Sequence, residues 1–268
     1  MSASASLARV VATSGVLLAR SSAIIVLLAG WELFARSGKV TMFVLPPLSA
    51  VVERVLADAI GGDLLRNTLL TLYRALAGFL IAAVAGVALG VLIMRSKISR
   101  WFFDPIISVG FPMPKIAFLP IIVLWFGVYD LSKISMVVFD AVFPIVTATI
   151  IGIQGVEREL IWSARGMGAS DREAIWQVVL PAALPRILTG LQVALPIALI
   201  VAIVSEMTMG GYGLGGAMLT ASRFSNSRGV FAALLEITVV GYVLVKGMAL
   251  LRRRLLVWHA EADSPATA

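Results

Sequence analysis

Three ionisable side chains, Arg74, Asp140 and Glu206, lie inside long apolar segments of this 268-residue sequence. A charge inside a membrane is costly, so each of these residues needs a charged partner or water, and such residues commonly mark solute pathways or proton relays. The three charges are too scattered along the sequence to form a proton relay. They could line a solute pathway, or they could pair between helices and fix helix packing.

The chain offers few residues for covalent or metal chemistry. It contains no cysteine, which excludes disulfides, thiol catalysis and thiolate metal sites. Its only histidine, His259, lies in the C-terminal tail, which argues against a histidine-based metal or catalytic site. We therefore predict no catalytic residues, no metal site and no cofactor bound by this chain.

The composition is that of an integral membrane protein. Hydrophobic residues make up 60% of the chain, charged residues make up 14%, and the mean hydropathy is +0.98. A soluble domain carries about 25% charged residues. The net charge of +7 does not indicate nucleic-acid binding, because basic residues of membrane proteins gather at the cytoplasmic ends of their spans. Membrane lipid is an expected partner, and nucleic acid is not.

Six apolar segments predict an all-α protein with six transmembrane helices, since each is near the ~20 residues that a helix needs to cross the hydrocarbon. The first segment is short and could instead be a cleaved signal peptide, but no clear small-x-small cleavage site follows it, which favours a retained span. The segments are Ser21–Ala35, Asn67–Met94, Asp104–Gly127, Lys133–Ile153, Ile187–Met207 and Val230–Leu251.

The sequence divides into three regions around these segments. Residues 1–66 hold the first span and an amphipathic helix predicted over Leu48–Ile60, which suits the outer membrane surface or packing against the bundle. Residues 67–254 form the transmembrane core, and residues 255–268 form a tail. Basic residues favour the side of the N-terminus, and the RRR run at 252–254 strengthens this bias. We therefore expect a multi-pass protein of the inner (plasma) membrane with both termini in the cytoplasm.

Four prolines, Pro105, Pro112, Pro114 and Pro120, interrupt the third apolar segment. Each removes a backbone donor, so a continuous helix facing lipid is not expected there. Broken backbone inside a membrane must be buried in protein or line a wet cavity, although a simple kink is an equal alternative. The candidate residues of a translocation pathway are Pro112, Pro114, Trp125, Asp140, Ser205 and Glu206.

The sequence GGYGLGG, residues 210–216, follows the fifth apolar segment. A glycine run holds a helix poorly, which predicts a tight or re-entrant loop on the outer side of the membrane. The chain has no GxxxxGK[ST] motif, and the loop faces away from cytoplasmic nucleotide, so this run is not a phosphate-binding loop.

A polar stretch, Ser163–Arg186, separates the fourth and fifth apolar segments and faces the cytoplasm in this orientation. Gly168 is predicted to end one short helix, and the residues SDRE at 170–173 fit a capping box that begins the next. An apolar run follows, and Pro181 and Pro185 are predicted to punctuate the way into the fifth segment. Two capped helices outside the bilayer suit docking on a soluble partner, and a well-capped connector is the alternative.

This polar stretch resembles the EAA loop of ABC importer permeases, whose pattern is roughly EAA-x3-G-x9-I-x-LP. Ala164, Gly168, Val178, Leu180 and Pro181 match it with the correct spacing, whereas Trp162 and Ser163 replace the first two residues. Four other stretches are similar to the nitrate/taurine/aliphatic-sulfonate permeases: the proline-rich third segment, FVLPPLSAVVERVL, NTLLTLYRALAGF and the LRRRLLVWHAEAD tail. The resemblance covers about residues 40 to 260.

The resemblance implies a type I importer domain of six helices that dimerises with a second copy of itself. Each copy would rest a cytoplasmic coupling helix on one of two ABC ATPase subunits, which bind ATP and Mg²⁺. A periplasmic or lipid-anchored solute-binding protein would deliver a small anion such as a sulfonate, taurine, nitrate or an aromatic carboxylate. Transport by alternating access requires no covalent chemistry in this chain. The residues expected to couple to the ATPase are Ala164, Arg165, Met167, Gly168, Ala169, Ser170, Asp171, Arg172, Glu173, Leu180 and Pro181.

A secondary transporter driven by an ion gradient is the alternative function. It would predict internal repeats and several carboxyl groups near the membrane midplane, and neither is evident. A membrane-embedded enzyme would need a nucleophile or a metal cluster, and the absence of cysteine and the single tail histidine argue against one.

Overall fold

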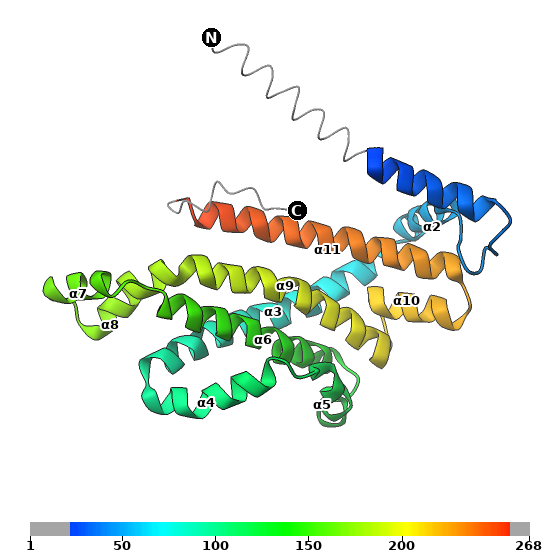
Figure 1. Ribbon diagram of the computed structural model, residues 1–268. Helices are drawn as coiled ribbons and strands as arrows, with labels where there is room; N and C mark the ends of the chain where they lie inside the picture. The colour runs from blue at the N-terminus through cyan, green and yellow to red at the C-terminus, as the bar shows by residue number, and fades with distance from the viewer. Residues whose placement is uncertain (1–21, 258–268) are drawn as a thin grey trace, which may run out of the picture. The chain divides into compact units, whose positions relative to one another are not determined.

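The computed structural model describes residues 22–257, in which all regular secondary structure is helical (Figure 1). Both chain ends, with His259 and most of the expected tail, lie outside these residues. Within the described part, four helices are long and apolar enough to cross a membrane, or five if one bent pair counts as a span. The predicted all-helical class is thereby confirmed, and several helices have the length and composition of membrane spans. The four helices are α3 (Asp63–Arg95), α6 (Asp130–Gln154), α9 (Leu180–Met209) and α11 (Ser227–Leu255).

The described chain groups into two compact units, of which the smaller joins residues 22–64 to Met218–Leu235. It contains a helix over residues 22–36 and the helix α2 (Leu48–Gly61), which confirms the amphipathic helix predicted there. The Trp31 indole ties the first of these helices to the following turn by donating a hydrogen bond to the Pro46 carbonyl at 3.0 Å. The helix over residues 22–36 is about 22 Å long at 1.5 Å per residue, which is shorter than the ~30 Å hydrocarbon core.

The third apolar segment is broken, as predicted, but only around its last three prolines: Pro105 lies inside the first helix of the segment and does not interrupt it. The helix α4 (Lys97–Gly110) is followed by a 3₁₀ turn, η1 (Lys115–Phe118), and the helix α5 (Leu119–Phe126), with a bend of 97° between the two parts. Pro112 and Pro114 occupy the connection, and Pro120 lies in the first turn of α5. The backbone N–H that each of these three prolines lacks costs little there, because neither the connection nor the first turn of a helix uses that group in an intrahelical hydrogen bond.

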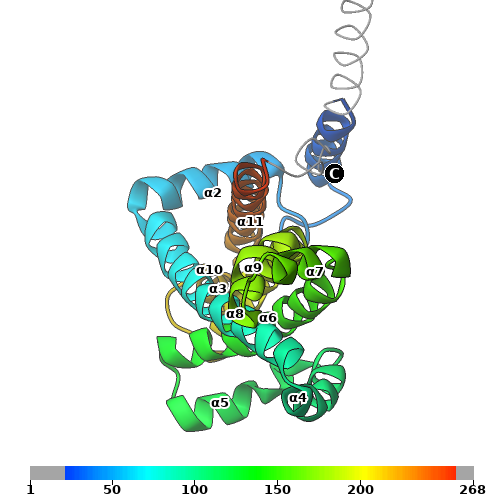
Figure 2. The same ribbon diagram turned by 90° about the vertical axis from the view of Figure 1, so that its left-hand side faces the viewer.

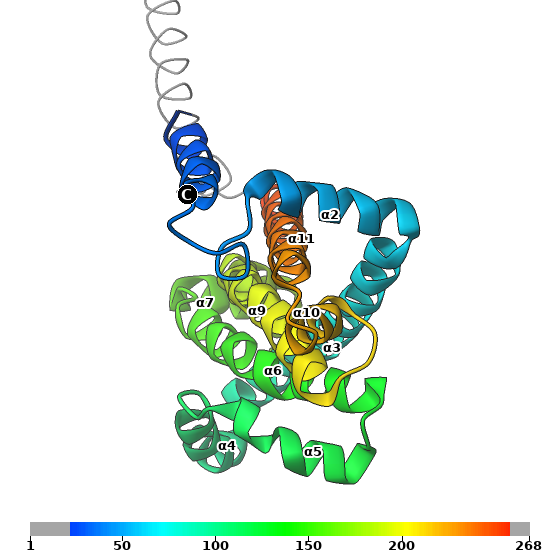
Figure 3. The same ribbon diagram turned by 90° about the vertical axis from the view of Figure 1, so that its right-hand side faces the viewer.

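The helices α3, α6 and α9 lie side by side in the core of the larger unit, residues 65–217 and 236–257 (Figures 2 and 3). Small residues let their backbones approach closely. A Cβ on Gly190 of α9 would lie 2.3 Å from the Ala148 Cβ of α6, and a Cβ on Gly86 of α3 would lie 2.9 Å from the Ile145 side chain. Close backbone approach is the main source of helix association where lipid removes the hydrophobic driving force. The three helices therefore hold the groups at both of their ends in fixed positions.

The helix that contains α9 begins earlier than its prolines suggested. The helices α7 (Arg158–Gly166) and α8 (Asp171–Ala174) form a hairpin, and a π-helical turn, η2 (Ile175–Val179), joins α8 to α9. The helix is thus continuous from Asp171 to Met209, and the expectation that Pro181 and Pro185 interrupt it is wrong. Pro181 lies two residues after the π-helical turn, a form of helix that accommodates a local change in hydrogen bonding, and Pro185 lies within α9.

Candidate functional site

The α7–α8 hairpin lies at the end of the core where α9 begins. The predicted capping box is present: the Glu173 amide donates to the Ser170 hydroxyl at 3.3 Å, and the Ser170 amide donates to the Glu173 carboxylate at 2.8 Å. An ion pair of 2.9 Å between Arg165 and Asp171 links α7 to the start of α8. Because this pair is exposed, water screens it, and the cap is the stronger restraint on the hairpin.

Gly168 ends α7 with a left-handed backbone, at φ +93°. The Ala169 amide donates to the Ala164 carbonyl and the Gly168 amide donates to the Arg165 carbonyl, both at 3.0 Å. This is the hydrogen-bond pattern of a Schellman motif, in which glycine is the preferred residue. A Cβ at position 168 would meet nothing within 4 Å. The requirement for glycine is therefore one of backbone conformation and not of space.

The hairpin presents apolar side chains at its surface. Met167 is 82% exposed and Trp162 is 61% exposed, whereas Ala164 is only 5% exposed. Ala164 thus packs inside the hairpin of its own chain, and the apolar surface open to a partner includes Met167, Trp162 and Leu160. The other expected coupling residues are exposed or half-buried: Arg165, Gly168, Ala169, Ser170, Asp171, Arg172, Glu173, Leu180 and Pro181.

At the opposite end of the core, four charged side chains form a group, here named the charge cluster: Arg74, Lys133 and Glu206, which are buried, and Asp130, whose side chain is 47% exposed. Arg74 lies between two carboxylates, with Nη1 2.6 Å from Glu206 Oε1 and Nη2 2.7 Å from Asp130 Oδ1. The Glu206 side chain has no exposed surface, and the Lys133 residue is 3% exposed. Two positive and two negative charges balance within the cluster, which offsets part of the cost of burying Arg74, Lys133 and Glu206.

The glycine-rich residues 210–216 enclose the Glu206 carboxylate. The Gly215 amide donates to Glu206 Oε2 at 3.0 Å, and Arg74 donates to the Tyr212 carbonyl at 2.6 Å. A Cβ on Gly213, where φ is +131°, would lie 2.3 Å from the Glu206 carboxyl carbon. Any residue other than glycine is thus excluded at position 213, both by the backbone conformation and by the lack of space. The predicted loop is present over residues 210–213, but the end of the glycine run lies in the helix α10 (Leu214–Arg223).

Thr71 of α3 completes the enclosure of the carboxylate. Its hydroxyl lies 2.9 Å from Glu206 Oε2 and accepts a hydrogen bond from the Leu214 amide at 2.9 Å. Asn67, one turn earlier on α3, accepts from the Gly213 amide at 3.0 Å. The glycine-rich loop is therefore fixed to α3 and α9 through polar contacts that all converge near one buried carboxylate.

The six residues expected to line a pathway do not gather at one place. Ser205 is buried beside Glu206, whereas Asp140 pairs with the buried Lys115 at 3.1 Å. Trp125 is 69% exposed, and Pro112 and Pro114 are exposed in the connection before η1. Both carboxylates thus have a cationic partner between helices. The sequence marked Arg74 as a candidate without indicating its partner, and it indicated no role for Lys115, Asp130 or Lys133, because the partners of the two carboxylates lie far from them in the chain.

Comparison with known proteins identifies the family of this chain. The family described as "Binding-protein-dependent transport system inner membrane component" matches residues 78–257, which include the α7–α8 hairpin and Glu206. The chain belongs to this family. It is a permease subunit, and hydrolysis of ATP belongs to a separate subunit of such transporters. The expected ABC permease identity is thereby confirmed, and the chain is not itself an enzyme.

Relatives of this permease match along most of its length. A putative aliphatic sulfonates transport permease protein of Bacillus subtilis is 34% identical, over 87% of this chain and 85% of the relative. A taurine transport system permease protein of Escherichia coli is 31% identical, over 89% and 88% of the two chains. The fold is shared with the inward-facing MetNI methionine ABC transporter, at a TM-score of 0.65, 19% identity, and 74% and 98% coverage of this chain and that one.

Removal of the central cation of the charge cluster should destabilise the permease. In Arg74→Leu, Glu206 loses its buried partner, which costs about 3–5 kcal/mol. Arg74→Leu/Glu206→Leu removes one charge of each sign and leaves Asp130 to balance Lys133, so we expect it to be more stable than the single variant. Thermal unfolding of the purified permease in detergent measures both effects. Arg54→Leu, which breaks a surface pair with Asp58, is the control and should cost at most about 1 kcal/mol. An unfolding temperature of Arg74→Leu equal to that of the wild type would contradict this role.

Gly168→Val should distort the turn between α7 and α8, because a Cβ-bearing residue pays about 1–2 kcal/mol for a left-handed backbone. The matched control is Gly166→Val, since position 166 is equally open but has no positive φ. Hydrogen exchange of the amides of residues 164–173 should accelerate in Gly168→Val and change much less in Gly166→Val. Equal exchange in the two variants would show that the turn does not depend on this glycine.

Proposed function

We propose that this permease imports a small organic or inorganic oxyanion of the sulfonate, taurine, nitrate or aromatic carboxylate type. The observation that carries the proposal is the identity of over 30%, across more than 80% of both chains, to permeases named for aliphatic sulfonates and for taurine. A nitrate import permease protein of Leptolyngbya laminosa is 32% identical over 65% of this chain. These named solutes share a compact, oxygen-rich or zwitterionic head group. Ligand-induced melting shifts of the partner binding protein would identify the solute.

The permease is proposed to work as two copies of this chain with two cytoplasmic ABC ATPase subunits, which bind ATP and Mg²⁺. A periplasmic or lipid-anchored binding protein delivers the solute to the outer side. Each copy is proposed to have six spans: the helix over residues 22–36, the bent pair α4–α5 and the four long helices. An even number of spans leaves both termini on the same side of the membrane, which we propose is the cytoplasm. Family membership supports the ATPase and binding-protein partners, and the basic run at 252–254 supports the orientation.

The α7–α8 hairpin is proposed as the coupling element that rests on the ATPase. Its cap and its Schellman turn hold it as a defined unit, and Met167 and Trp162 give it an exposed apolar contact. The helix continues from Asp171 to Met209, so a displacement of the hairpin moves α9 along its whole length. At 1.5 Å per residue, Ala174 and Glu206 are about 48 Å apart along this helix. ATP-driven approach of the ATPase subunits would then alternate access between the two membrane sides.

Met167→Glu tests the docking role of the hairpin. A charge placed in an apolar contact should weaken association with the ATPase by about 2 kcal/mol or more, the size of an interface hot spot. Copurification of the ATPase, and stimulation of ATP hydrolysis by loaded binding protein in liposomes, should both fall. The control is Met42→Glu, the same change at an exposed methionine outside the hairpin. Unchanged assembly and stimulation in Met167→Glu would show that the hairpin is only a connector, whatever solute is transported.

A further inference from the structure

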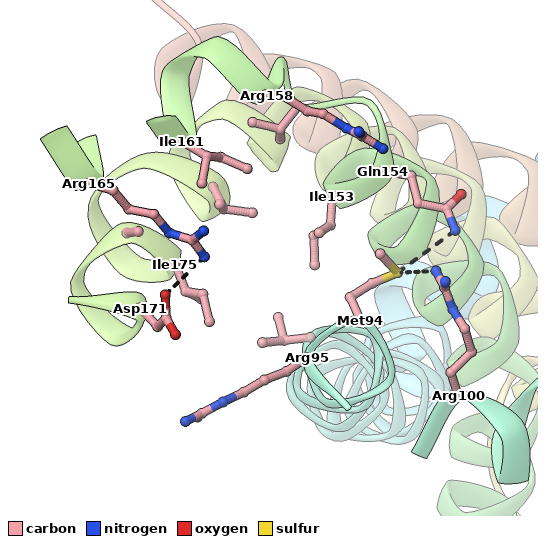
Figure 4. A pocket seen from close by; sticks show the side chains of 14 residues that line it. Met94, Arg95, Arg100, Ile153, Gln154, Arg158, Ile161, Arg165, Asp171 and Ile175 are labelled. Atoms are coloured by element: carbon pink, nitrogen blue, oxygen red, sulfur yellow. Dashed lines mark hydrogen bonds and ion pairs between the residues drawn. The ribbon is translucent and has the colours of Figure 1, made fainter. Parts of the chain in front are cut away.

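A cavity of about 640 Å³ lies between the α7–α8 hairpin and the ends of α3 and α6 (Figure 4). It is here named the arginine pocket, because Arg95, Arg100, Arg158 and Arg165 line it. The four arginines come from three different elements: the end of α3, the first turn of α4, and α7. The pocket therefore depends on the tertiary arrangement and is not a feature of one helix.

The charges of the arginine pocket are unbalanced. Asp171 is the single acidic residue of its lining, and it already pairs with Arg165 at 2.9 Å. Among residues 22–257, Arg158 has no ion pair or hydrogen bond from its side chain, and Arg100 contacts only the Met94 sulfur, at 3.0 Å. Figure 4 shows Arg100 and Gln154 both directed toward that sulfur, with Arg158 on the same side of the pocket. Four arginines against one aspartate leave a surplus of three positive charges.

Much of the remaining lining is apolar. Val91, Ile153, Ile161, Ile175 and Val179 contribute aliphatic side chains to it. The spacing of Arg158, Ile161 and Arg165 on α7 places all three on one face of that helix, while Met167 and Trp162 remain exposed. Trp162 is one turn from both Arg158 and Arg165 and so lies on the same side of α7 as the pocket, whereas Met167 lies beyond the end of α7 and does not line the pocket.

We propose that the arginine pocket binds a small oxyanion that carries a short apolar tail. Guanidinium groups form strong, charge-assisted hydrogen bonds with phosphate, sulfonate and carboxylate oxygens, and the isoleucine and valine side chains suit an aliphatic tail. Arg95, Arg100 and Arg158 all lack a carboxylate partner among the described residues. Figure 4 shows Arg95 directed away from the other two, so Arg100 and Arg158 are the main anion contacts. A bound anion bridges α7 to α3 and α4 and holds the hairpin against the core. The inference does not depend on which solute is transported.

The anion has two possible sources with the same chemistry: a free organic anion, or the headgroup of an anionic lipid. The full-length permease in nanodiscs of phosphatidylcholine should bind hexanesulfonate in isothermal titration calorimetry, and more tightly than methanesulfonate because of the longer tail. In nanodiscs that contain phosphatidylglycerol, native mass spectrometry should detect retained anionic lipid, and this lipid should compete with hexanesulfonate. Competition identifies lipid as the occupant in the membrane, and its absence identifies a free anion.

Arg100→Gln/Arg158→Gln should weaken anion binding at least about tenfold, since each lost charged hydrogen bond is worth about 1.5–3 kcal/mol or roughly a tenfold change in affinity. The matched control, Arg253→Gln/Arg254→Gln, removes two exposed arginines that do not line the pocket and should bind like wild type. Both pairs lie on exposed or half-buried positions, so folding should persist, which size-exclusion chromatography checks. The proposal is overturned if wild type binds neither probe, if both double variants bind equally, or if the pocket variant loses only its association with the ATPase.

Discussion

The buried contact between Arg74 and Glu206 is the constraint on which much of this structure depends. A carboxylate without exposed surface, at the end of a membrane helix, must be neutralised and hydrogen-bonded. Arg74 supplies the charge, and Thr71 and the Gly215 amide supply further hydrogen bonds. This amide can approach the carboxylate only because several residues that follow α9 are glycines, which have no Cβ to collide with it. The glycine run is therefore explained by the carboxylate that it encloses, and not by flexibility.

The same helices that converge on the charge cluster also converge on the α7–α8 hairpin. α3 carries Arg74 near its start and Arg95 at its end, and α6 begins with Asp130 and ends at Gln154. α9 runs the other way, from the hairpin to Glu206. Small residues such as Gly190 keep these helices in close contact, and closely packed helices shift between discrete arrangements and do not deform continuously. Such a core is suited to link events at one side of a membrane to events at the other.

The sequence was sufficient to predict local features of the fold and to assign the chain to the class of helical membrane proteins. Hydropathy predicted the long helices, the prolines around 112 and 114 predicted the break before α5, and the SDRE residues predicted the cap of α8. Each of these signals depends on neighbours within a few residues. The course of the helix past Pro181 was mispredicted, because the π-helical turn that accommodates the proline has no simple sequence signal.

Long-range pairing was beyond the reach of the sequence. Glu206 and Asp140 could be identified as costly charges, yet their partners Arg74 and Lys115 could be assigned only once the helices were packed. Ala164 illustrates the same limit, since its motif suggested a surface contact while tertiary packing buries it. The arginine pocket also combines residues from several elements, none of which forms a motif by itself.

The most direct test of the coupling role of the α7–α8 hairpin is a cross-linking measurement, which the absence of cysteine from this chain makes simple. A single cysteine at Met167, combined with single cysteines across the surface of the ATPase, would be treated with a short bismaleimide in membranes. Docking of the hairpin on the ATPase predicts a specific permease–ATPase adduct from Met167→Cys and none from Tyr212→Cys, an exposed position at the other end of the core. An adduct from Tyr212→Cys but none from Met167→Cys would contradict the assignment of the hairpin as the coupling element.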